Sequence, residues 1–185
     1  MEAHAEVQQR IEQWLEVVIE TQQRIEQRLQ KLVRTQDQMA GQLGQLRDEF
    51  VELRYREHVG GYFGRLLRRA RVVRADELDD LIDHGLTTGV LDEETAHDLR
   101  LADLIVRGRR PGERDETYLV VEVSAGLDRD DVLRAARRAA VLRRLRPALA
   151  VVAGDGLTPE AAEVAGAAGV WQVLDGRAEA PRSGT

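Results

Sequence analysis

The chain has 185 residues, of which 43% are hydrophobic and 32% are charged, and its formal net charge is −6. This length allows one ordinary domain with an extension, and the composition is typical of a soluble protein. No apolar run is long enough to span a bilayer, and no signal-peptide core follows Met1. The absence of cysteine excludes disulfides, thiolate metal sites and cysteine nucleophiles. We therefore expect a cytoplasmic protein with no membrane partner.

Apolar residues in the first third of the chain recur at alternating spacings of four and three residues, which is a heptad repeat. The inner positions of this repeat, here called the seam, are Ile11, Leu15, Val18, Gln22, Ile25, Leu29, Leu32, Gln36, Met39, Leu43, Leu46, Phe50 and Leu53. The seam predicts one helix over residues 8–56 that assembles into a homo-oligomeric coiled coil. Leucine at position a with isoleucine or valine at position d favours a trimer or tetramer over a dimer. The alternative, a helix folded back on its own domain, fits the last two turns only.

After residue 56 the pattern changes to short segments separated by turn and cap residues. Asp76 and Asp92 are expected to cap the second and third helices of this region. Helices are expected at residues 59–73, 77–84, 93–99, 128–146 and 159–169, and strands at 101–107, 117–124, 148–153 and 170–174. This order predicts an α/β domain with a mixed sheet over residues 57–176, after a coiled-coil helix at 1–56 and before a disordered tail at 177–185.

Two carboxylates lie on neighbouring strands of this expected sheet. If the hairpin turns at residues 111–113, Asp103 lies opposite Glu122 or nearly so. Like charges opposite one another destabilise a sheet, and an acid inside an apolar strand also pays for desolvation. A divalent cation between the two carboxylates would relieve both costs. The alternative is that Glu122 faces solvent or pairs with an arginine such as Arg107, and the pattern leaves both interpretations open.

The segment Leu-Ala-Asp103-Leu-Ile-Val, a hairpin, Val-Val-Glu122-Val-Ser124 and an arginine-rich helix together resemble the PD-(D/E)XK nuclease superfamily. The chain is also similar to uncharacterised bacterial proteins that fuse an N-terminal coiled coil to such a domain. The resemblance covers roughly residues 51–176 and implies a helix–hairpin–helix–strand core. It implies that Asp103 and Glu122 bind Mg²⁺ or Mn²⁺, joined by a helix glutamate, for which Glu57 is the first candidate and Glu52 the second.

Two positions depart from the motif of that superfamily. Ser124 stands where a lysine normally orients and activates the attacking water, and Ala102 replaces the proline before the aspartate. The only lysine of the chain, Lys31, lies in the coiled-coil segment, and the pKa of an arginine is too high for proton transfer near neutral pH. We therefore expect an oligomeric nuclease-like protein with a degenerate site formed by Asp103, Glu122 and Ser124, and with weak or absent phosphodiester hydrolysis. The alternative is a non-catalytic interaction or scaffold protein.

Arginines gather in two parts of the sequence. Five of them, between residues 65 and 74, are not interrupted by an acid, and a second group follows residue 133. Arg107, Arg134, Arg137 and Arg138 are the candidates for contact with a nucleic-acid backbone. The arginines of the second group could equally form the solvated face of an amphipathic helix, with the acids at its start complementing the helix dipole.

Overall fold

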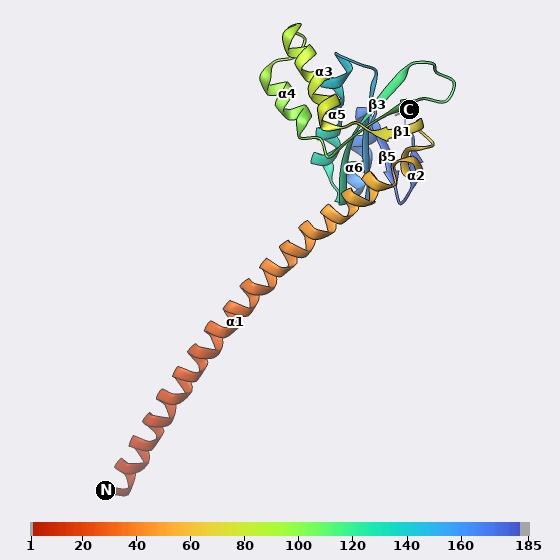
Figure 1. Cartoon of the computed structure of the whole chain (residues 1–185). Helices are drawn as coiled ribbons and strands as arrows, with labels where there is room; N and C mark the ends of the chain where they lie inside the picture. The colour runs from red at the N-terminus through yellow and green to blue at the C-terminus, as the bar shows by residue number, and fades with distance from the viewer. Residues whose placement is uncertain (1, 182–185) are drawn as a thin grey trace. The chain divides into compact units, whose positions relative to one another are not determined.

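A single helix, α1 (Glu2–Glu57), runs through the first third of the chain. The structure, a computed structural model, describes residues 2–181, and the side chains from Arg10 onward. The long helix predicted from the seam is confirmed (Figure 1). The chain divides into two units between Leu46 and Arg47, so the last turns of α1 belong to the second unit.

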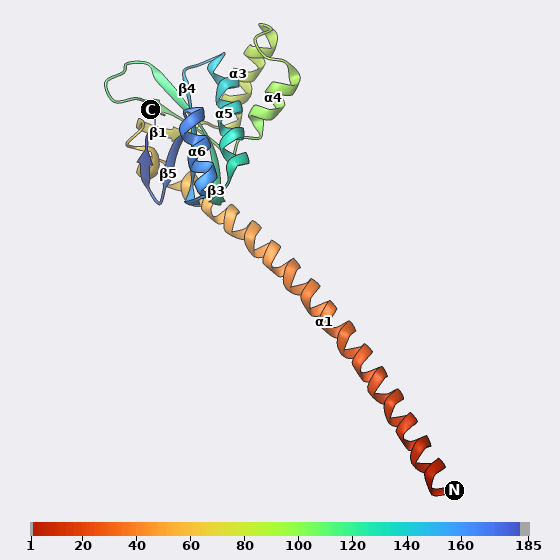
Figure 2. The same ribbon diagram turned by 180° about the vertical axis from the view of Figure 1, so that it is seen from behind.

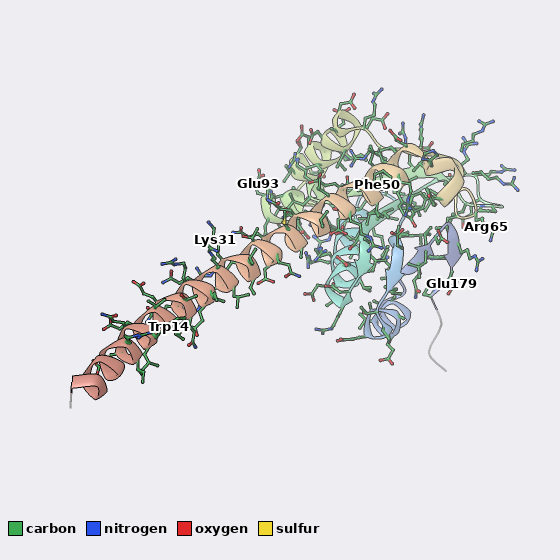
Figure 3. The ribbon with its side chains drawn as sticks, turned by 90° about the horizontal axis from the view of Figure 1, so that it is seen from below. Trp14, Lys31, Phe50, Arg65, Glu93 and Glu179 are labelled. Atoms are coloured by element: carbon green, nitrogen blue, oxygen red, sulfur yellow. The ribbon has the colours of Figure 1, made fainter. Side chains whose placement is uncertain are left out.

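The seam of α1 is exposed in both units. Its apolar residues, from Ile11 to Leu53, are between 50% and 67% exposed. The last turns of the helix carry a second apolar face, because Val51 and Tyr55 are buried in the core of the second unit. That core therefore begins upstream of residue 57, where the sequence placed the start of the domain. Trp14 and Lys31 mark the first unit's part of α1 in Figure 3.

The second unit continues as a mixed α/β domain, as the order of segments predicted. The elements after α1 are α2 (Val59–Phe63), β1 (Arg68–Val72), α3 (Ala75–Thr87), α4 (Glu93–Arg100), β2 (Leu104–Arg109), β3 (Glu116–Leu127), α5 (Arg129–Arg143), β4 (Ala148–Leu157), α6 (Pro159–Ala168), β5 (Trp171–Leu174) and β6 (Arg177–Glu179). The six strands form one sheet in the order β1-β2-β3-β4-β5-β6. The β3–β4 and β4–β5 pairs are parallel and the other three pairs are antiparallel.

Apolar side chains cover both faces of this sheet, because neighbouring residues of a strand point to opposite sides. Val120 and Val152 pack with helices α3 to α6, whereas Val121 and Val151 pack with α2 and the end of α1. Figure 2 shows α5 and α6 together in front of the sheet, and they also contact each other. Within residues 2–181, no helix carries an apolar stretch of the length that a bilayer span requires.

The helix expected at residues 59–73 is wrong in its second half. Helix α2 ends at Phe63, and the chain turns into strand β1 from Arg68. Gly60, Gly61 and Gly64 weaken a helix here, by roughly 1 kcal/mol each relative to alanine. The hydrogen bonds that β1 makes with β2 provide the alternative, so tertiary pairing overrides the helical pattern.

The tail expected from residue 177 is also wrong in its first residues, because β6 pairs there with β5. Leu174 pairs with Arg177, which leaves Asp175 and Gly176 as a two-residue turn in which both residues have positive φ. Asp-Gly is a favoured sequence for this type of hairpin turn. The remainder of the expected tail, from residue 182, lies outside the described residues.

Of the two expected helix caps, the structure confirms Asp92 and not Asp76, and it adds Asp128. Asp92 accepts a hydrogen bond from the backbone of Thr95, and Asp128 accepts from the backbone of Asp131. Asp76 does not cap its helix, because α3 begins at Ala75 and places Asp76 in the first turn. Its negative charge there still complements the helix dipole.

Candidate functional site

The register of β2 and β3 brings the two expected carboxylates together. Leu104 pairs with Val121, and extending the antiparallel register by one residue places Asp103 beside Glu122. The backbone N–H of Val123 donates to Oδ2 of Asp103 over 2.7 Å. The predicted adjacency is therefore confirmed, and Asp103 and Glu122 are here called the acid pair.

Two arginines of α5 hold the buried member of the acid pair. Glu122 is only 1% exposed. Its Oε1 accepts from Nη1 of Arg138 over 2.7 Å, and its Oε2 accepts from Nε of Arg134 over 3.2 Å. The alternative of an arginine partner is therefore the one observed, although the partner is not Arg107.

Helix α5 can present these two guanidinium groups together because Arg134 and Arg138 lie one helical turn apart on the same face. Asp131 forms an ion pair with Arg134. The buried Arg138 is further fixed by donating to the backbone oxygen of Leu101 over 2.8 Å and to Oδ1 of Asp98 over 3.2 Å. This network positions a fixed positive charge against the acid pair.

Burial and mutual repulsion shape the protonation of the acid pair. Burial raises the pKa of Glu122, and the neighbouring charge of Asp103 raises it further, while Arg138 and Arg134 act to lower it. Burial also raises the pKa of Asp103 against the opposing effects of the Val123 N–H and the arginines. The arginines therefore offset the cost of burying these carboxylates only in part.

One face of α1 completes the surroundings of the acid pair. Nη2 of Arg56 donates to the backbone oxygen of Asp103 over 2.8 Å and to Oε1 of Glu52 over 2.6 Å. The charge of Asp103 also contributes to raising the pKa of Glu52. Glu57, the first candidate for a third carboxylate, is exposed at the end of α1, and none of the described contacts joins it to the acid pair. The helix glutamate near the acid pair is therefore Glu52 and not Glu57, because five residues of helix turn the direction of Glu57 by roughly 140° from that of Glu52.

Ser124, which the resemblance aligns with the superfamily's lysine, contacts α1 rather than the acid pair. Its Oγ donates to Oδ1 of Asp48 over 3.2 Å, and the backbone N–H of Ala125 donates to the same oxygen over 2.8 Å. Asp48, Glu52 and Arg56 are spaced by four residues and so share one helix face. Asp48 was not among the residues expected from sequence, although this spacing is a signal by which it could have been found.

The remaining predicted site arginines are also engaged by carboxylates. Nη2 of Arg107 donates to Oε1 of Glu77 over 3.0 Å, and Nε of Arg137 donates to Oδ2 of Asp98 over 2.8 Å. The two Asp98 ion pairs, with Arg137 and then Arg138, hold the pKa of that carboxyl below its usual range. The solvated-face interpretation holds for Arg137, which is exposed, whereas Arg138 is buried and Arg134 is half-buried in contacts with Glu122.

The donor atoms do not fit a resident divalent cation. Mg²⁺ and Mn²⁺ are bound through free oxygen ligands. Both carboxylate oxygens of Glu122 and one of Asp103 already accept hydrogen bonds, and Glu52 is paired with Arg56. Among the residues whose placement is described, no three histidine, cysteine, aspartate or glutamate side chains are grouped to share a metal ion.

Comparisons of the chain with protein-family models, with curated proteins and with solved structures found no match. The resemblance to the PD-(D/E)XK superfamily therefore rests on the residues around Asp103 and Glu122 and on the order of the surrounding elements.

Proposed function

We propose that this chain is a homo-oligomeric, nuclease-like scaffold protein whose degenerate PD-(D/E)XK site does not catalyse hydrolysis. One observation carries the proposal: Arg138 and Arg134 occupy both carboxylate oxygens of Glu122. A guanidinium group provides positive charge but neither an open coordination position nor a proton acceptor near neutral pH. The arrangement neutralises the acid pair without creating a group that activates water.

The energetics of burial explain why such a site can persist without chemistry. An isolated carboxylate at the position of Glu122 loses several kcal/mol of hydration. Two guanidinium groups offset this loss, and the hydrogen bond from Arg138 to Leu101 ties the same network to the chain before β2. The acid pair and its arginines thereby connect α5, β2 and β3.

The order of elements supports the nuclease-like part of the proposal. The end of α1, the β2–β3 hairpin, helix α5 and strand β4 occur along the chain in the helix–hairpin–helix–strand order that the resemblance implies, with α2, β1, α3 and α4 between α1 and β2. The acid pair lies where β2 begins and β3 is buried, as that order requires.

Homo-oligomer formation follows from the exposed seam. Eleven large apolar side chains of the seam lie on one helix and are half exposed or more, and their heptad spacing matches a second copy of the same helix. An unpaired helix of this kind would leave a long apolar stripe in water. We propose a trimer or tetramer, in which each copy contributes one α/β domain.

A second candidate, a metal-dependent nuclease, is favoured by one observation. The charge of Asp103 raises the pKa of both Glu52 and Glu122, so these three acidic side chains lie close to one another. A cation that displaced the α5 arginines would relieve their repulsion. The two candidates differ in whether Mg²⁺ or Mn²⁺ binds at the acid pair.

Calorimetric titration of Mg²⁺ and of Mn²⁺, together with cleavage assays on labelled DNA and RNA, tests the proposal. The variants are Asp103→Asn/Glu122→Gln, which preserves side-chain shape, and the matched control Asp115→Asn/Glu163→Gln at two exposed acids. We expect the wild type and both variants to give the same weak heats and no cleavage. Metal binding and cleavage that the first variant loses and the control retains would establish the nuclease and overturn the proposal.

Light scattering tests the assembly separately. The wild type is expected to have the mass of three or four chains, and Leu29→Asp/Leu32→Asp is expected to lower that mass because it places charges in the seam. Gln27→Asp/Gln30→Asp adds the same charge outside the seam and is expected to leave the mass unchanged. A wild-type monomer at micromolar concentration contradicts the assembly.

A further inference from the structure

One end of the α/β domain carries a set of arginines that have no acidic partner. Five exposed arginines are here called the basic end, and they come from the segment before β1, the start of β1, the end of β2 and the loop after β2. None has a carboxylate within ion-pair distance among the residues that the structure describes; they are Arg65, Arg68, Arg69, Arg109 and Arg114. Figure 3 shows side chains with nitrogen tips extending outward in the region of Arg65. This is the opposite of the situation in α5, where every predicted site arginine has a carboxylate partner.

The fold forces two of these positive charges together. Arg68 and Arg109 are directly paired across the β1–β2 ladder. Like charges in this position destabilise a sheet unless an anion or solvent screens them. Glu116 on β3 is the residue paired with Arg109 in the neighbouring β2–β3 ladder, but its carboxylate forms ion pairs with Arg71 and Arg107 and not with Arg109.

The backbone is shaped to bring these arginines close. The β1–β2 register shifts between Arg68 and Arg71, and Arg69 within this bulge has a φ of 54°. Gly108 allows the close approach, because a Cβ atom there would lie 2.8 Å from the backbone oxygen of Arg68. A left-handed arginine costs free energy, so the bulge is a specific feature rather than a regular strand.

The bulge of β1 and the loop after β2 line a half-open hollow of about 250 Å³. Arg68, Arg69, Arg109, Arg110 and Gly112 line it, together with Glu113. Glu113 accepts from Nη1 of Arg110 over 3.0 Å, so the single acid in the lining is already matched by one of the four arginines. Three guanidinium groups remain without an ion-pair partner among the described residues, around a space large enough for a small anion.

We propose that this hollow binds phosphoryl groups. Guanidinium groups match phosphate oxygens with paired, charge-assisted hydrogen bonds, and several of them around one hollow favour a multiply charged anion over a single carboxylate. The group is presented either by a free oligophosphate or by a nucleic-acid backbone, which share this chemistry. The inference does not depend on the proposed function, because it uses neither the acid pair nor the seam.

The net charge of −6 does not oppose this binding. Charges on a protein surface are screened over about 8 Å at physiological ionic strength. An anion at the hollow therefore responds to the adjacent arginines more than to acids elsewhere on the molecule. Binding is expected to weaken as salt concentration rises, as for other phosphate contacts.

Calorimetric titration of pyrophosphate into the full chain tests the inference, with fluorescence anisotropy of a labelled DNA duplex as a second arm. The test variant is Arg65→Gln/Arg68→Gln/Arg109→Gln, which keeps Arg69 and so does not alter the left-handed position. The matched control is Arg144→Gln/Arg146→Gln/Arg177→Gln, which removes equal charge from exposed positions elsewhere. Circular dichroism establishes that both variants are folded, and Arg109→Gln alone serves if the triple variant is not.

Pyrophosphate affinity is expected to fall at least about tenfold in the test variant and to change little in the control, because each lost arginine removes a charge-assisted contact. Comparable loss of duplex binding identifies a nucleic-acid backbone as the source, and binding of pyrophosphate alone identifies a free oligophosphate. No binding of either ligand by the wild type, or equal losses in test and control variants, overturns the site. Binding of polyglutamate as tightly as pyrophosphate also overturns it, since the site would then select any polyanion.

Discussion

Arginines play opposite parts in two regions of the same domain. In α5 they point toward carboxylates from other segments, and Arg138 is buried with Glu122 and Asp98 as partners. At the basic end, Arg68 and Arg109 face each other across a ladder and remain exposed. The α5 arginines stabilise the fold, because Arg134 and Arg138 compensate the buried charge of Glu122. The arginines of the basic end form no such ion pairs among the described residues.

The difference shows that a run of arginines in a sequence does not identify a binding surface. What separates the two regions is the location of the acids. Asp98 comes from the end of α4, which lies far from α5 in the chain. Glu122 comes from β3, the strand that immediately precedes α5. Only the folded arrangement reveals which guanidinium groups retain free hydrogen-bond donors.

The largest effect is expected from Arg138→Met, because it leaves Glu122 buried beside Asp103 with one charge partner fewer. Removing one member of a buried ion pair costs about 3–5 kcal/mol, and urea unfolding at neutral pH measures the loss in the free energy of unfolding. Arg109→Met at the basic end is the matched control and is expected to change that free energy by less than about 0.5 kcal/mol. Equal effects at the two positions would abolish the distinction between the regions.

A double substitution sharpens this result. Arg138→Met/Glu122→Leu removes both buried charges, and apolar replacement of a buried ion pair is often close to neutral. We expect the double variant to recover most of the stability that Arg138→Met loses, leaving a deficit of about 1–2 kcal/mol from imperfect packing. Arg134 retains Asp131 as a partner and is partly exposed, so it does not become a buried unpaired charge. The single variant Glu122→Leu completes the cycle. If the stability loss of the double variant equals the sum of the losses of Arg138→Met and Glu122→Leu, the two residues are not coupled.

The pH dependence of stability is expected to change with Asp103→Asn. Burial raises the folded-state pKa of Asp103 from the ordinary value of 3.8, so the folded chain binds more protons than the unfolded chain just above that pH. Stability from this group therefore falls as pH rises from about 3.8 through the raised pKa. The Asp103→Asn variant does not lose stability in this way, because asparagine does not ionise. It also removes the negative charge that raises the pKa of Glu122. Urea unfolding is expected to show Asp103→Asn gaining stability relative to the wild type as pH rises toward neutrality.

Asp155→Asn provides a comparison of opposite sign. The pKa of Asp155 is held below 3.8 by its hydrogen bond from Arg54. Its contribution is therefore present above 3.8 and lost as pH falls, so the variant is expected to be less stable than the wild type at neutral pH and to approach it in acid. Parallel pH curves for both variants and the wild type contradict the assigned shifts.

The sequence predicts the acid pair well and its partners poorly. The alternation of apolar residues around Asp103 and Glu122 sets which side chains share a face, and a turn near Pro111 fixes the register between them. The local pattern favours Arg107 as a partner for Glu122, because Arg107 lies on the same hairpin. Arg134 and Arg138 reach Glu122 only because α5 crosses the sheet after the chain reverses, which no local pattern specifies.

Local signals also failed where two structures compete for the same residues. The stretch before Val73 has a helical stripe, yet Arg68 to Val72 become a strand because β2 offers an unpaired edge. At the other end of the sheet, Asp175 and Gly176 are a favoured hairpin-turn sequence, and they continue the chain into β6 where a tail was expected. The helix α1 was predictable over its length because its repeat is long and uninterrupted, and the number of copies it joins stays a prediction.

The smallest effect is expected from Arg65→Gln/Arg68→Gln/Arg109→Gln on the stability of the ligand-free protein. These side chains are exposed and have no carboxylate partner among the described residues, so their removal breaks no ion pair. Relief of the repulsion between Arg68 and Arg109 acts in the opposite direction to any lost packing of their aliphatic stems. The free energy of unfolding is expected to change by less than about 0.5 kcal/mol, or to rise slightly, when measured in urea without phosphate. A loss of more than about 1 kcal/mol would mean that these arginines stabilise the fold as those of α5 do, and the two regions would then differ in exposure alone.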